Sequence, residues 1–249
     1  MKNFISSVSL VMLLAVSTFN ASAATLVEVE QTNNQVQKMW IEGDKFRVDM
    51  AGNNEYMVAD YKSNKIYLID PAKKEIMDMS QFINKDKQSS KGLKIEIKPM
   101  GKGQDVAGYQ TTKFQLSANG KQCRQVLVSK KAQKDADIGR LMEALSQVDV
   151  NPMGAQFMQD CDRAGILFAR EMKNMGMPLA TINNGKLEDK VRKIQKNVAL
   201  PAGGFKLPAG YRHVNLQQKI QDAMGSAFQG GQINPEMKKM MEDMMRQRQ

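Results

Sequence analysis

The sequence has little of what most metal and catalytic centres require. Its 249 residues include one His and two Cys, which argues against Cys/His zinc sites and Cys-ligated iron–sulfur clusters. His213 is the single imidazole, and no Gly-x-Ser-x-Gly precedes it as a nucleophile elbow. Phosphate-binding Gly-x-x-x-x-Gly-Lys-Ser/Thr and helix-opening Gly-x-Gly-x-x-Gly motifs are missing too. We expect a protein that is not an enzyme and has no cofactor.

Long hydrophobic runs are also missing. The apolar stretch Val8–Val16 is far shorter than the roughly 20 residues that a membrane-spanning helix needs. Lys2 stands before it and Ala21-Ser22-Ala23 after it, which is the pattern of a cleaved secretory signal over residues 1–23. Ala24 and Thr25 occupy the place where a lipoprotein has its Cys. We therefore expect a soluble mature protein in the periplasm.

Aromatic residues are scarce, at 6%, whereas basic residues are abundant. With 36 Lys and Arg against 26 Asp and Glu, the formal net charge is +10. Scattered aromatics give no base-stacking platform, so we expect no nucleic-acid partner. An exported basic protein meets anionic lipid head groups instead, and peripheral contact with an anionic membrane surface is the expected consequence of this charge.

Export changes the expected chemical state of the two cysteines. An even count in an oxidising compartment indicates a disulfide, and Cys123–Cys161 is the only intrachain pair. Two free buried thiols and a redox pair are the alternatives. The spacing is not Cys-x-x-Cys, which argues against redox catalysis.

Alternation of period two predicts short antiparallel strands from Ala24 to about Lys130. Asn119-Gly120 is a strong signal for a type I′ hairpin between the last two strands. Strands return over Met177–Asn183, and Phe205–Tyr211 is expected as a short closing strand and turn. Residues 186–200 fit either a strand or a helix by spacing, and the Gly-Pro cluster that follows favours a strand.

A helical insertion is predicted over about residues 133–176, where the period changes to between three and four. Ile138, Leu141 and Met142 begin one apolar face that extends to Val148. A second helix is expected to start at Asn151 and Pro152 and to end at Gly176. A Cys123–Cys161 bond would pin this insertion over the sheet.

A Met-rich helical tail is predicted over residues 217–249, after a domain that covers residues 24–216. Five methionines repeat there at helical spacing, and thioethers are soft ligands for Cu(I) or Ag(I). An amphipathic helix with Met as its apolar residue is the simpler interpretation, because no His or Cys joins the group. The five are Met237, Met240, Met241, Met244 and Met245.

Several motifs resemble the LolA/LolB-like lipoprotein-carrier superfamily. Gly43–Asp49 (GDKFRVD) is similar to its "kFR-d" strand, and Lys65–Pro71 (KIYLIDP) to the hairpin that follows. The segment Phe205–Tyr211 (FKLPAGY) resembles the ending of a branch of exported domains of unknown function. The resemblance implies a mainly β (α+β) fold: a curved, unclosed antiparallel half-barrel whose concave apolar face is covered by a helical lid.

The same resemblance implies that the concave face can hold an acyl chain and that Arg47 helps to latch the lid. We therefore expect a non-enzymatic binding module for an acyl chain, lipid or lipidated protein. The alternatives are a structural or protein-interaction domain with a filled core and a Met-dependent soft-metal binder. The residues expected at the ligand site are Trp40, Phe46, Arg47, Tyr67, Phe114 and Phe168.

Overall fold

The first part of the fold is a meander of six short strands. The computed structural model describes residues 24–52, 54–80, 92–146 and 158–215. Within this set of six, consecutive strands pair antiparallel, and turn residues such as Gly43 and Asn64 take positive φ angles between them. They are β1 (Ala24–Gln31), β2 (Val36–Glu42), β3 (Lys45–Asp49), β4 (Tyr56–Asp60), β5 (Lys65–Asp70) and β6 (Glu75–Asp78).

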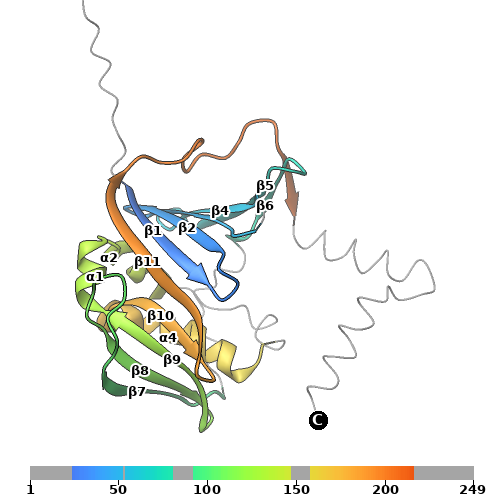
Figure 1. Cartoon of the computed structure of the whole chain (residues 1–249). Helices are drawn as coiled ribbons and strands as arrows, with labels where there is room; N and C mark the ends of the chain where they lie inside the picture. Colours follow the sequence, from blue (N-terminus) through green and yellow to red (C-terminus); the bar gives the residue numbers. More distant parts are fainter. Residues whose placement is uncertain (1–23, 53, 81–91, 147–157, 216–249) are drawn as a thin grey trace, which may run out of the picture.

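Six further strands extend this meander into one open sheet (Figure 1). Asn119 and Gly120 both have positive φ in the β8–β9 turn, as a type I′ hairpin requires. The order β12-β6-β5-β4-β3-β2-β1-β11-β10-β9-β8-β7 leaves β12 and β7 at opposite edges, which confirms the predicted mainly β, unclosed fold. The added strands are β7 (Ile95–Lys102), β8 (Thr112–Ala118), β9 (Lys121–Ser129), β10 (Met177–Asn183), β11 (Lys186–Val198) and β12 (Arg212–Asn215).

Three described helices lie between β9 and β10: α1 (Lys130–Asp135), α2 (Gly139–Ser146) and α4 (Asp160–Met175). Ile138, Leu141 and Met142 are buried, as the helical period predicts. The helix α4 begins at Asp160 after Gln159, whereas its expected start at residues 151–152 lies outside the described residues, as does Val148. The tail 217–249 with its five methionines also lies outside them.

The sheet has two apolar faces with different coverings. On the helix-side face, Val27, Ile41 and Val126 join the three helices in the main core. On the outer face, Val58, Ile69 and Ile76 form a second, smaller cluster. Because side chains alternate along each strand, neighbours such as Phe46 and Arg47 point to opposite faces.

The outer cluster is covered by residues 199–211, which we call the crossover segment. It connects β11, beside β1, to β12 at the edge of the sheet beside β6, so it passes across the strands between them (Figure 1). Phe205, Leu207 and Tyr211 from this segment pack against the outer cluster. The segment therefore seals the outer face of β3–β6.

The closing strand differs from the expected one. Phe205–Tyr211 forms turns and irregular backbone, and the strand lies at Arg212–Asn215, where it pairs parallel with β6. Positive φ at Gly203, Gly204 and Gly210 breaks the extended conformation before the strand. The prediction of a strand at Phe205–Tyr211 was wrong because these glycines and Pro208 turn the chain across the sheet instead of along it.

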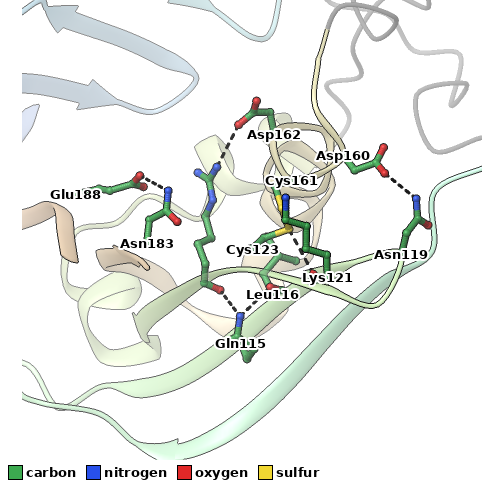
Figure 2. The surroundings of a disulfide bond; sticks show 11 residues. Gln115, Leu116, Asn119, Lys121, Cys123, Asp160, Cys161, Asp162, Asn183 and Glu188 are labelled. Carbon is green, nitrogen blue, oxygen red and sulfur yellow. Dashed lines mark hydrogen bonds and ion pairs between the residues drawn. A yellow bond between two sulfur atoms is a disulfide. The ribbon is translucent and has the colours of Figure 1, made fainter. Parts of the chain in front are cut away.

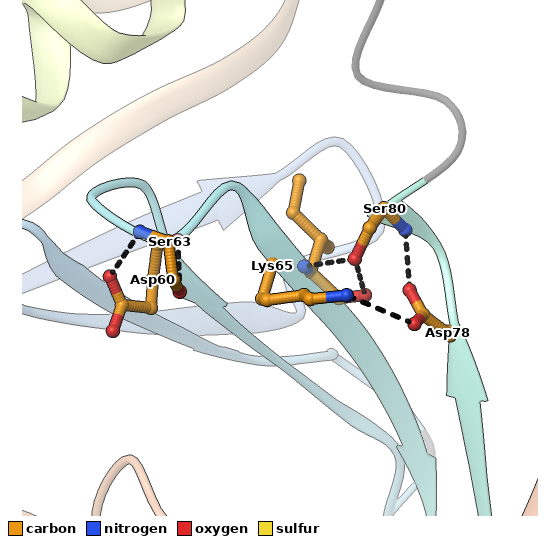
Figure 3. Close-up of polar contacts among 6 residues, drawn as sticks. Asp60, Ser63, Lys65, Asp78 and Ser80 are labelled. Atoms are coloured by element: carbon orange, nitrogen blue, oxygen red, sulfur yellow. Dashed lines mark hydrogen bonds and ion pairs between the residues drawn. The ribbon is translucent and has the colours of Figure 1, made fainter.

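Short polar contacts secure the edge of the meander (Figure 3). The Ser80 hydroxyl accepts a hydrogen bond from the Ile66 amide at 3.0 Å, and the Ser80 amide donates to the Asp78 carboxylate at 2.8 Å. Burial raises the pKa of Asp78, but the hydrogen bonds from Ser80 and the charge of Lys65 outweigh it, and the net pKa is lowered. These contacts tie the end of β6 to the start of β5.

Candidate functional site

The start of α4 is fixed over the β8–β9 hairpin by three different links (Figure 2). Cys123 on β9 and Cys161 on α4 form a disulfide with their Cα atoms 5.3 Å apart, which confirms the predicted pairing. The Asn119 side-chain amide donates to the Asp160 carboxylate at 2.8 Å, and the Arg124 guanidinium lies 3.3 Å from the Asp162 carboxylate. The helix cannot slide along the sheet at this end.

The other end of α4 is fixed by close backbone packing. Gly176 follows the helix with φ of 126°, and a Cβ there would lie 2.7 Å from the Ser129 carbonyl carbon and the Lys130 nitrogen. Only glycine fits this approach. Lys173 also forms an ion pair with Glu143 of α2 at 3.1 Å. Both ends of α4 are therefore held, and the space beside it has rigid walls.

A groove lies between α4 and the strands β7 and β8, and we call it the α4 groove. Its apolar part has a volume of about 440 Å³, within the range of ligand sites. A wider chamber of about 1020 Å³ shares Phe114 and Met175 with it, so the two are adjacent. The apolar walls come from Ile95, Ile97, Phe114, Leu167 and Met175.

A smaller cavity of about 370 Å³ lies on the other flank of α4, between this helix and strands β8–β10. Phe168 and Met172 line it from the helix, and Leu116 and Val126 from the sheet. All four residues are less than 10% exposed, at 4, 9, 0 and 3%. Ile166, Ala169, Pro178 and Thr181 also line it and are half-buried, like most walls of the α4 groove, so this cavity is a second candidate site beside the helix.

A third apolar region lies on the helix-side face of β4–β6. Met57, Ile66, Leu68 and Met77 are half-buried there and belong to neither core cluster among the described residues. The described helices pack on β8, β9 and β10, away from these strands. This face is a further rival of the α4 groove for an apolar ligand.

The six residues expected at the ligand site do not come together. Phe114 lines the α4 groove, while Phe168 lies in the main core and Phe46 packs against that core. Trp40, Arg47 and Tyr67 project from the outer face of the sheet. One apolar site on one face therefore cannot contain all six.

Arg47 is buried, at 7% exposure, and its contacts are with the crossover segment. One terminal nitrogen donates to the carbonyls of Ala202 at 3.0 Å and Gly204 at 3.1 Å. Its Nε donates to Asp49 at 2.7 Å, and the guanidinium lies 4.0 Å from the Tyr56 ring centroid. Burial raises the pKa of Tyr56, and the charge of Arg47 opposes that rise. Arg47 fastens the crossover segment to the outer face, away from the helices.

One carboxylate beside the smaller cavity is in an unfavourable environment. Asp189 of β11 pairs in register with Thr181 of β10, which lines that cavity. Burial raises the pKa of Asp189, and a hydrogen bond from the Thr181 side chain only partly opposes this rise. The ionised carboxylate is therefore disfavoured in the folded protein.

The residues that wall the α4 groove were not all visible in the sequence. Ile95 and Ile97 alternate in a segment predicted as a strand, but nothing local indicates that this strand is an edge beside α4. Leu167 is one apolar residue among many in its helix. The sequence shows the hydrophobic period of each element, but which elements lie side by side depends on the topology of the sheet.

Two features that the described residues lack bear on other classes of function. No helix within them is long and apolar enough to cross a membrane. In the same part of the chain, no three His, Cys, Asp or Glu side chains gather as ligands for a metal ion. The five tail methionines lie outside that part.

Comparisons with known proteins identify the family. Among solved structures, PNGF-II matches with 15% identity over 79% of this chain and 32% of its own, at a TM-score of 0.43. MucB in complex with MucA(peri) matches with 9% identity over 78% of this chain and 57% of its own, at a TM-score of 0.36. The chain thus spans less than two thirds of either protein. No curated protein matches it. The family model "Domain of unknown function (DUF4412)" matches residues 24–211, and the chain belongs to this family.

Proposed function

We propose that this protein is a non-enzymatic binding module for an acyl chain, a lipid or a lipidated protein, and that the α4 groove holds the chain. The observation that carries the proposal is a groove with apolar walls, next to a wider chamber, beside a helix that is fixed at both ends. A preformed apolar site loses little conformational entropy on binding. The resemblance to lipoprotein carriers agrees with this assignment.

We also propose that the protein acts in the periplasm. The signal pattern of residues 1–23 and the oxidised Cys123–Cys161 pair both fit an exported, periplasmic protein. The basic charge supports peripheral contact with anionic membrane, from which a lipid would enter the groove. Burial of about ten methylene groups, at about 0.8 kcal/mol each, contributes about 8 kcal/mol, from which the costs of association are subtracted.

Binding of a fluorescent fatty acid tests the proposal. Delipidated protein is titrated with cis-parinaric acid, and saturable binding is expected. Ile97→Glu places a carboxylate on the groove wall, so we expect affinity to fall at least about tenfold. Leu187→Glu is the control, because Leu187 lies on β11, is 40% exposed and lines neither the groove nor the wider chamber.

Phe168→Glu is unsuitable as the site variant. Phe168 is 4% exposed in the main core, so a buried carboxylate there would unfold the domain instead of blocking a site. Unchanged melting temperatures of Ile97→Glu and Leu187→Glu verify folding. Absence of saturable binding by delipidated wild-type protein would contradict the proposal and favour a filled interaction domain. Native mass spectrometry of the exported protein that finds bound copper and no lipid would favour the soft-metal alternative.

A further inference from the structure

The α4 groove changes from apolar to basic along its length. Cross-strand pairs along the two strands beside it run from Ile97–Leu116 through Pro99–Phe114 to Lys102–Thr112. The chamber at the Lys102 end is also lined by Lys130 and Lys131. Among the described residues that line this chamber, none is acidic. The groove thus has a mainly apolar trough, whose lining also includes Arg170 and Glu171, and one positively charged end.

A break in the β7–β8 pairing directs Lys102 toward the groove. The register shifts between Pro99 and Lys102, where three steps along β7 match two along β8. Gly101 sits in this bulge with φ of 87°, a conformation that favours glycine. Without the extra residue, Gly101 would pair with Thr112 and Lys102 would point to the outer face.

The lysines at this end differ in whether an acidic side chain pairs with them. Lys131 pairs with Asp135 at 2.5 Å, and its nitrogen lies 5.6 Å from the Tyr109 ring. Within the described part of the chain, no ion pair engages Lys102 or Lys130. Two ammonium groups beside the groove therefore have their charge available for a ligand.

We infer that the ligand is an amphiphile with an anionic head group, and that its head lies at Lys102 and Lys130 while its chain lies along Ile97, Phe114 and Leu167. This inference rests on the proposed function, because it adds a head-group site to the acyl site. Lys98 provides a matched control: it is exposed on the same strand but pairs with Gln115 on the outer face.

Competition with bound cis-parinaric acid tests the inference, using laurate and its uncharged counterpart 1-dodecanol. Wild-type protein is expected to bind laurate more tightly. Lys102→Gln/Lys130→Gln should weaken laurate binding about three- to tenfold and leave dodecanol unchanged, since exposed charge pairs contribute modestly. Lys98→Gln should change neither. Raising NaCl from 0.05 to 0.5 M should weaken laurate binding selectively.

The outcomes separate the inference from the function on which it rests. Dodecanol binding equal to laurate binding, or an equal effect of Lys98→Gln, overturns the head-group site and leaves the acyl site standing. Binding of neither amphiphile overturns both. In a parallel arm, selective transfer of phosphatidylglycerol over phosphatidylcholine from vesicles would identify a phospholipid as the source of the anionic head, while laurate binding alone would identify a free fatty acid.

Discussion

Replacement of Arg47 by Met tests whether the crossover segment is fastened to the sheet by one side chain. The substitution keeps the aliphatic stem but removes the donors to Ala202, Gly204 and Asp49. It also removes the contact of the guanidinium with Tyr56. The released carbonyls can return to water, so the loss is smaller than three buried hydrogen bonds. We expect about 3 kcal/mol less stability, from charged hydrogen bonds and one cation–π contact.

For a domain of this size, about 3 kcal/mol corresponds to a decrease in melting temperature of roughly 6–12 °C. Calorimetry measures it, and amide exchange should show the largest loss of protection in β12, which the crossover segment positions. Arg192→Met is the control: Arg192 is half exposed and lies 3.9 Å from Glu30, so its loss should cost less than about 1 kcal/mol. A melting temperature for Arg47→Met within a degree of the wild-type value would refute the reasoning.

Three further predictions concern covalent and titrating groups. Replacing Cys123 and Cys161 by Ser should lower stability by about 4 kcal/mol in denaturant unfolding, because the bond closes a loop of sequence separation 38; a loss below about 1 kcal/mol would contradict a structural role. Burial raises the pKa of Tyr61 to about 12, so its neutral form contributes stability that is fully present below about pH 10 and is lost as the pH rises toward 12. Tyr61→Phe should therefore reduce the loss of stability at alkaline pH, and an unchanged loss would refute this prediction. Because the pKa of Asp189 is raised, its protonated form contributes stability that is present below about pH 4 and is lost as the carboxyl group ionises. Asp189→Asn should therefore raise the melting temperature at pH 7 and not at pH 3, and equal effects at both pH values would contradict this prediction.

Local signals in the sequence predicted most of the elements. Asn119-Gly120 predicted its hairpin because both positions require positive φ, which these residues accept at low cost. Met177–Asn183 was predicted as a strand and is β10. Lys186–Val198 is strand β11, although its spacing also suited a helix; pairing with β1 and β10 on both sides decided the conformation.

The candidate site was harder to predict because it depends on which face each residue occupies. Phe46 and Arg47 are neighbours in one motif, yet strand alternation sends them to opposite faces. Aromatic residues were a poor guide, since Trp40 lies beside Arg47 on the outer face, 6.0 Å from its guanidinium. The basic end of the α4 groove depends on a bulge at Gly101, which a two-residue period does not reveal.

Cross-linking with a photoreactive fatty acid tests most directly the claim that the α4 groove holds an acyl chain. A diazirine near the end of the chain reacts with the side chains around it, and peptide mapping locates the adducts. We predict adducts on Ile95, Ile97, Phe114 and Leu167, reduced by excess laurate. Adducts concentrated on Met57, Leu68 and Met77 would place the chain on the helix-side face of β4–β6 and contradict the account.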